Sequence, residues 1–107
     1  GVLELGETTR DAVAREVLEE TGLVVSVGPV VDVIDHVDTD SDTRVEYHFV
    51  IADYLCAATG GTLVAGSDVD AVIYADPSSL KPYDLTSLTQ SVIGQAMALY
   101  ASGRRPQ

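Results

Sequence analysis

Apolar residues recur at helical spacing near the start of the chain. Val13 and Val17 stand four positions apart, which places them on one side of a helix. The hydroxyl of Thr8 suits an N-cap, and Gly22 suits the left-handed position that closes many helices. We therefore predict a helix from about Thr8 to Thr21, with one apolar stripe that faces a core.

Valine and isoleucine dominate the middle of the chain, as is typical of strands. Residues 23–37 predict one or two strands, with a break at Gly28-Pro29. Residues 38–43, DTDSDT, predict a turn, and residues 44–56 predict the clearest strand. Its first half alternates in polarity, whereas residues 49–52 are apolar on both faces. We expect that second half to be covered on both sides.

Shorter elements follow in the second half of the chain. Residues 58–61 predict a turn, and residues 62–65 and 71–75 predict two short strands. A second helix is expected from about Thr86 to Ser102, with an apolar stripe at Leu88, Val92, Ala96 and Tyr100. The order of helix, strands and helix predicts an α+β domain in which a mixed sheet lies between helices.

Length and charge limit the class of protein. The 107 residues suit one small domain, residues 1–107, and the net charge of −11 argues against binding nucleic acid through phosphate contacts. The sequence contains no apolar run long enough to span a membrane and no secretion signal, so we expect a cytoplasmic protein with no membrane partner. The single cysteine, Cys56, lies in a predicted strand and is interpreted as a core residue.

The first helix carries an unusual cluster of acids. Glu16, Glu19 and Glu20 lie in its second half, and Glu19 and Glu20 stand in the last turn, where the helix dipole favours basic residues. Glu16 and Glu20 are also four apart, a spacing at which like charges repel. One interpretation is a solvated helix face, the commonest fate of a charged run. The other is a site for Mg²⁺ or Mn²⁺, which bind carboxylate oxygens.

The wider context favours the metal site. The segment GVLELGETTRDAVAREVLEETGL, residues 1–23, resembles the Nudix box at all nine of its specified positions. These positions are Gly1, Glu7, Arg15, Glu16, Val17, Glu19, Glu20, Gly22 and Leu23. The resemblance implies a Nudix-type α/β/α sandwich. It also implies Mg²⁺-dependent hydrolysis of a pyrophosphate bond in a nucleoside diphosphate-linked substrate, such as ADP-ribose, a sugar nucleotide or a nucleoside triphosphate.

The resemblance also implies roles for individual residues. Glu19 and Glu20 are the best metal ligands, and Glu16 is a third ligand or orients the attacking water. Glu7 binds metal through water, and Arg15 pairs with a carboxylate to hold the preceding loop against the helix. In some members a carboxylate from a later loop takes part, and here Asp68 and Asp70 lie in about the right place.

The family fold places strands before the box, and this sequence starts at the box itself. We therefore expect the N-terminal strands to be missing, and the chain alone to associate as a homodimer or to be poorly stable. The alternative function is a catalytically incomplete Nudix-like fragment that binds a nucleotide or a protein partner without turnover. The identity of the substrate and of the general base stays open.

Overall fold

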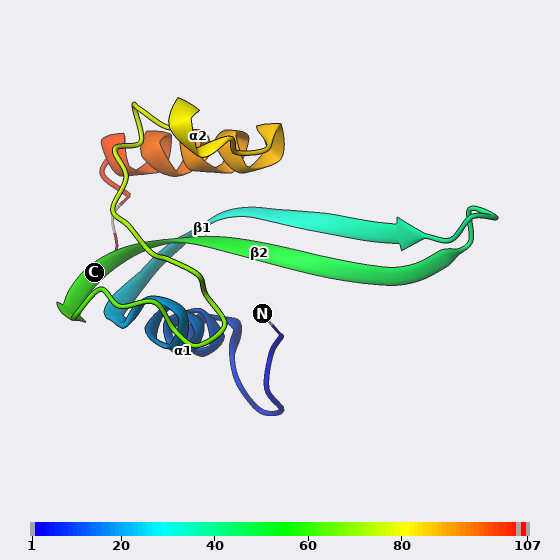
Figure 1. The fold of residues 1–107 in the computed structure, drawn as a ribbon, viewed down its shortest axis with the longest axis horizontal. Helices are drawn as coiled ribbons and strands as arrows, with labels where there is room; N and C mark the ends of the chain where they lie inside the picture. The colour runs from blue at the N-terminus through cyan, green and yellow to red at the C-terminus, as the bar shows by residue number, and fades with distance from the viewer. Residues whose placement is uncertain (1, 105, 107) are drawn as a thin grey trace.

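The computed structural model describes residues 2–104 and 106, and for Val45 and Glu46 the backbone alone. Gly1, the first glycine of the box, lies outside the described residues. The elements are α1 (Thr9–Thr21), β1 (Leu23–Thr39), β2 (Val45–Gly61), the short 3-10 helix η1 (Lys81–Tyr83) and α2 (Ser87–Ala101). Figure 1 shows α1 and α2 on opposite sides of the sheet. The predicted α+β class is confirmed, with helices on both sides of a sheet.

Both long helices begin and end where their capping residues predict. The Thr8 hydroxyl oxygen accepts from the backbone N–H of Asp11 at 3.1 Å, and Gly22 adopts φ 76° and donates to the Leu18 carbonyl. The Thr86 hydroxyl oxygen accepts from the N–H of Thr89 in the same way. Neither long helix in the described part of the chain has the length and apolar character needed to cross a membrane.

The sheet consists of one long antiparallel hairpin, β1 paired with β2. The predicted break at Gly28-Pro29 is a shift of register between Val27 and Val30 inside a continuous strand. A side chain at Gly28 would place its Cβ 2.7 Å from the Leu55 carbonyl oxygen, so the strands approach closely there. The two described strands are antiparallel, so the parallel pair of the expected mixed sheet is not found among the described residues.

Three local predictions are wrong. Residues 58–61 are not a turn, because β2 continues through Gly60 and Gly61 to pair with Val24 and Leu23. Residues 62–65 and 71–75 are not strands. An extended segment becomes a strand only when a neighbouring strand completes its hydrogen bonds. Within the described residues the sheet ends at β1 and β2, and residues 62–65 run along the end of α1 instead.

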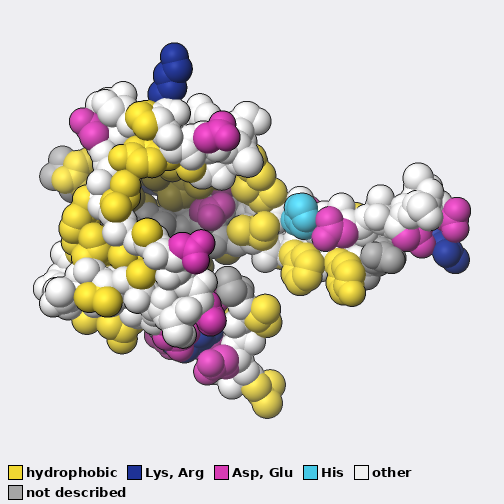
Figure 2. Space-filling view, viewed as in Figure 1, with side chains coloured by type: hydrophobic (Ala, Val, Ile, Leu, Met, Phe, Trp, Pro, Cys, Tyr) yellow, Lys and Arg dark blue, Asp and Glu magenta, His cyan; other side chains and the backbone are white. Residues whose placement is uncertain are grey.

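The outer half of the hairpin, residues 33–51, forms an arm that extends from the body of the molecule (Figure 2). Cover on both sides of residues 49–52 was expected, and the structure contradicts it: Phe49, Val50 and Ile51 are 49%, 66% and 42% exposed. The rings of Tyr47 and Phe49 stack with centroids 6.0 Å apart. Because successive side chains of a strand point to opposite faces, the arm presents apolar side chains to solvent on both of its faces.

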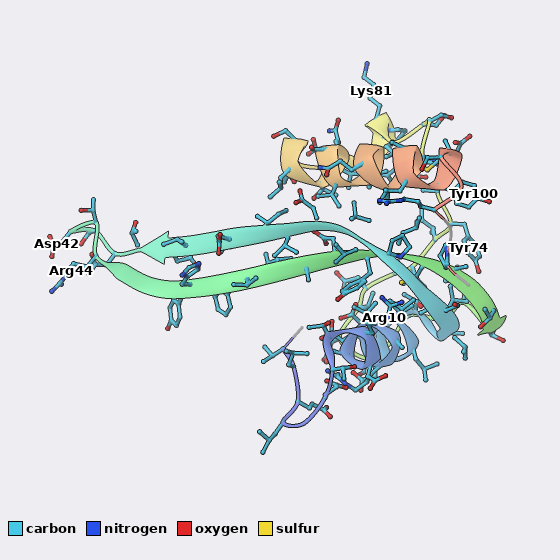
Figure 3. All side chains as sticks on the ribbon, turned by 180° about the vertical axis from the view of Figure 1, so that it is seen from behind. Arg10, Asp42, Arg44, Tyr74, Lys81 and Tyr100 are labelled. Carbon is cyan, nitrogen blue, oxygen red and sulfur yellow. The ribbon has the colours of Figure 1, made fainter. Side chains whose placement is uncertain are left out.

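The tip of the arm lies between β1 and β2 and includes residues 40–43 of the predicted turn 38–43, whereas Asp38 and Thr39 belong to β1. The Asp40 carboxylate accepts from the N–H groups of Asp42 and Arg44, each at 2.9 Å, and contacts the Arg44 guanidinium at 3.1 Å. Figure 3 shows Asp42 and Arg44 together at this tip. The Asp40 side chain thus closes the hairpin, as aspartates that bond nearby backbone amides commonly do in turns.

Candidate active site

Arg15 joins the loop before α1 to the helix. Its Nε donates to Glu7 Oε2 at 2.7 Å, its Nη2 donates to Glu7 Oε1 at 3.0 Å, and Nη2 also donates to the Val2 carbonyl at 3.2 Å. This is the pairing that the box motif implied. The Arg15 guanidinium, with help from the N–H of Glu4, holds the pKa of Glu7 below its ordinary value of 4.5.

Three more carboxylates surround the same guanidinium. Glu19 lies 3.2 Å from Arg15 Nη1, Glu16 lies 3.7 Å from Nη2, and Glu4 lies 3.6 Å from Nε. The hydrogen bonds to Glu7, followed by the charges of Glu4 and Glu19, raise the pKa of Arg15 above its ordinary value. One positive charge thus faces four carboxylates, which leaves an excess of negative charge at this end of the molecule. Glu4 is a member of this cluster that the sequence pattern did not reveal.

The three predicted metal ligands project from α1 at positions i, i+3 and i+4, which lie on one helix face. The last turn contains no basic residue. Glu16 is half-buried, and Glu19 and Glu20 are exposed. All three offer carboxylate oxygens, the donors that Mg²⁺ and Mn²⁺ prefer, so the donor set fits a divalent cation.

The side chains are not gathered as they would be around a bound ion. Among residues 2–104 and 106, no group of three or more His, Cys, Asp or Glu is arranged to hold a metal. Glu19 instead contacts Arg15. The chemistry of the donors therefore fits a metal, and the assignment of Glu7, Glu16, Glu19 and Glu20 as ligands stays a prediction.

The loop that carries Asp68 and Asp70 lies at the C-terminal end of α1, the end that carries Glu19 and Glu20. The N–H of Gly66 donates to the Glu20 carbonyl at 3.0 Å, and the N–H of Val69 donates back to the Gly66 carbonyl at 3.1 Å. Both aspartates are exposed. The fold thus brings the later loop next to the turn that carries Glu19 and Glu20. The glycine before SDVD, Gly66, is the feature of the sequence that indicates this close approach.

The opposite end of α1 is fixed to the sheet. The Thr9 hydroxyl lies 2.8 Å from the Tyr54 hydroxyl, and the Arg10 guanidinium lies 5.7 Å from the centre of the Tyr54 ring. Arg10 also donates to the Val27 carbonyl, and Figure 3 shows Arg10 between α1 and the sheet. Arg10 and Tyr54 were not singled out in the sequence, because their contact joins residues 44 positions apart.

Other candidate groups lie away from the glutamates. Burial raises the pKa of the half-buried Cys56 thiol, which suits a packing role. His36 and His48 are exposed on the arm, where His36 contacts Asp38 at 3.0 Å and His48 contacts Asp35 at 2.8 Å.

A cavity of about 400 Å³ lies on the α2 side of the sheet, lined by Val30, Val31, Gln95, Ala98, Leu99 and Arg104. Figure 1 places α1 on the other side.

The fold and the site define an α+β domain whose acidic helix is joined to its preceding loop by one arginine. A model of the NUDIX domain matches residues 1–93, and the chain belongs to the Nudix family.

A similar protein is the ADP-ribose pyrophosphatase of Methanocaldococcus jannaschii, which is 34% identical over 80 residues. The alignment covers 75% of this chain and 45% of that protein, so the chain spans less than half the length of its relative. No solved structure matches the chain.

Proposed function

We propose that this chain carries the catalytic carboxylates of a divalent-metal-dependent hydrolase. Its reaction is cleavage of a pyrophosphate bond in a nucleoside diphosphate-linked substrate: ADP-ribose, a sugar nucleotide or a nucleoside triphosphate. The observation that carries the proposal is the carboxylate cluster around Arg15, which extends to Glu19 in the last turn of α1, where the helix dipole disfavours negative charge. Membership of the Nudix family and the name of the relative support the same reaction.

Glu16, Glu19 and Glu20 would hold Mg²⁺ or Mn²⁺, and Glu7 would contact it through water. A divalent ion in such a site offsets the charge of the pyrophosphate and lowers the pKa of water. Glu19 would exchange its contact with Arg15 for the cation. Arg15 would keep Glu7 and the loop in place, because its two bonds to Glu7 do not involve the last turn.

The remaining roles concern the attacking water. Glu16 either completes the ligand set or orients the water, and Asp68 or Asp70 is a second candidate to accept its proton. The loop bearing the two aspartates is anchored to the Glu20 carbonyl, which supports a place for these aspartates near the attacking water.

The expected partner is a small nucleotide rather than nucleic acid, because the net charge of −11 disfavours contacts with a phosphate backbone. A cytoplasmic location stays a prediction.

A second candidate function is binding of a nucleotide or a protein without turnover. One observation favours it: the described carboxylates are not gathered into a group of three that could hold a metal. The two functions differ in a direct assay. Incubation with ADP-ribose, sugar nucleotides and nucleoside triphosphates, with and without Mg²⁺, should give products of pyrophosphate cleavage only when metal is present.

Glu20→Gln should remove this activity, while Asp84→Asn, an exposed acid next to η1, should retain it. Saturable nucleotide binding with no product for any substrate at millimolar Mg²⁺ would favour the second function.

A further inference from the structure

The chain leaving β2 is hydrogen-bonded to the end of α1. In the 62–66 segment, every second backbone N–H donates to a carbonyl at the end of the helix. The donors Thr62, Val64 and Gly66 reach the carbonyls of Gly22, Thr21 and Glu20 at 3.2, 2.9 and 3.0 Å. Figure 1 shows this part of the chain passing along α1.

These bonds fill a need that every helix end has. The last carbonyls of an α-helix have no donor within the helix. Here Gly22 supplies the donor for Leu18, and the 62–66 segment supplies donors for Glu20 and Thr21. The turn that carries Glu19 and Glu20 is therefore held by a segment about 45 residues further along the chain.

Gly66 is the closest point of this contact. A Cβ at position 66 would lie 2.1 Å from the Glu19 carbonyl oxygen, 3.1 Å from the Glu19 carbonyl carbon and 3.3 Å from Glu20 Cα. All three are backbone atoms, which cannot rotate away as a flexible side chain can. The reason for glycine here is close approach of two backbones.

We propose that Gly66 is a positioning residue of the metal site, an inference that rests on the proposed function. Its missing side chain lets the 62–66 segment dock on the last turn of α1, and this docking fixes the backbone from which Glu19 and Glu20 project. A larger residue displaces the segment and releases the carbonyls of Glu20 and Thr21. The two carboxylates then lose their shared orientation, and the affinity for a divalent cation falls.

The test compares Gly66→Ala with two glycines where a methyl group has room. A Cβ at Gly60 would meet only Val24 Cβ, at 3.9 Å, and a Cβ at Gly94 would meet nothing within 4 Å. Mn²⁺ binding, followed by electron paramagnetic resonance of the free ion, needs no substrate. Gly66→Ala should weaken Mn²⁺ binding by about tenfold or more, the scale seen for residues that orient metal ligands. Gly60→Ala and Gly94→Ala should bind as the wild type does.

A merely structural role would lower the melting temperature and leave Mn²⁺ affinity unchanged in the folded variant, and that result would overturn the proposal. Mn²⁺ binding by the wild type and by Glu20→Gln distinguishes failure of the proposed function from failure of the positioning role. If the wild type binds no Mn²⁺ at all, the proposed function fails first. If the wild type binds, Glu20→Gln does not, and Gly66→Ala binds normally, the positioning role alone is wrong.

Hydrogen exchange of the wild type tests the same coupling without a variant. Coupling between two sites is reciprocal, so if docking of the segment favours the metal, metal must favour docking. Saturating Mg²⁺ should therefore slow exchange of the Val64 and Gly66 amides relative to the amides of Gly94 and its neighbours in α2. Unchanged exchange at Val64 and Gly66 under saturating Mg²⁺ would contradict the proposal even if Gly66→Ala fails to fold.

Discussion

Arg15 and Glu7 form a two-point ion pair, with Nε to Oε2 at 2.7 Å and Nη2 to Oε1 at 3.0 Å. A guanidinium and a carboxylate match in this geometry, and the pair is more rigid than a single contact. It ties the loop of residues 2–7 to the middle of α1. Two of the remaining carboxylates near Arg15, Glu16 and Glu19, belong to the turns of α1 where metal ligands are predicted, so one side chain connects the loop and the candidate site.

The first prediction concerns acid stability. Because Arg15 lowers the pKa of Glu7 in the folded state, the ionised pair contributes stability above the ordinary pKa of 4.5, and this contribution is lost as pH falls through the folded-state pKa. Glu7→Gln should therefore unfold more easily than the wild type near neutral pH, and the difference should shrink in acid below pH 4.5. Urea unfolding across this range measures it.

The control is the same substitution in an Arg15→Gln background. Without Arg15, its main partner, Glu7 should contribute little pH dependence. The free energies of unfolding of Arg15→Gln and of the double variant should therefore change with pH in parallel. A Glu7→Gln difference that persists undiminished into acid would show that the ion pair is not its source.

The second prediction separates function from stability at the end of α1. Glu19→Gln and Glu20→Gln should each abolish metal-dependent turnover. Without metal, Glu20→Gln should raise the free energy of unfolding by about 0.3 kcal/mol, because it removes an i,i+4 repulsion with Glu16 and an unfavourable interaction with the helix dipole. Glu19→Gln should be close to neutral, since it also loses the contact with Arg15 at 3.2 Å.

Asp11→Asn provides the matched control for the dipole, because Asp11 lies in the first turn, where negative charge is favoured. It should lower stability and leave turnover intact. Near-normal rates for Glu20→Gln at saturating Mg²⁺ would remove Glu20 from the ligand set.

The third prediction is stabilisation by metal. A ligand that binds only the folded state adds about 2.7 kcal/mol at a hundred times its dissociation constant. Millimolar Mg²⁺ or Mn²⁺ should raise the melting temperature, and K⁺ at matched ionic strength should not. Equal shifts with K⁺ would mean that the salts simply screen the net charge of −11. The shift should disappear in Glu20→Gln.

The fourth prediction concerns the arm. Its exposed apolar side chains include Phe49 and Val50, which are 49% and 66% exposed, and long exposed strand edges pair with other chains. We expect the 107-residue chain to associate with a second copy at micromolar concentration, and Phe49→Ser to weaken this association. Tyr83→Ser is the control, because Tyr83 is 43% exposed but lies in η1, away from the arm. Light scattering after size-exclusion chromatography gives the mass of each species.

A monodisperse wild-type monomer that melts cooperatively would contradict this prediction. Association that survives Phe49→Ser and is lost in Tyr83→Ser would move the contact from the arm to the surface near η1.

Much of the molecule was readable from local signals. The helix ends were predicted to within one residue, because Thr8, Gly22 and Thr86 act on backbone groups only a few positions away. The hairpin turn at residues 40–44 was readable for the same reason, since Asp40 bonds the amides of Asp42 and Arg44. The box residues identified the family, and their spacing placed three glutamates on one helix face.

The sheet and the full surroundings of the site depended on contacts between distant segments. Residues 58–61 contain two glycines, which by themselves predict a turn. In the fold, β1 pairs with both glycines, so β2 continues through them. Residues 62–65 have the composition of a strand and instead satisfy the carbonyls at the end of α1. A backbone hydrogen bond needs a partner, and the sequence pattern does not say which partner the fold supplies.

The sequence by itself determined the helices and the alignment of Glu16, Glu19 and Glu20 on one helix face, because these depend on spacing along one chain segment, and the resemblance to the Nudix box implied the pairing of Arg15 with a carboxylate. Only the tertiary structure decided that the Asp68 and Asp70 loop lies at the end of α1, that Arg10 contacts Tyr54, and that Gly66 meets the backbone of Glu19. These contacts join residues more than 40 positions apart, and their geometry follows from how helix and hairpin pack together.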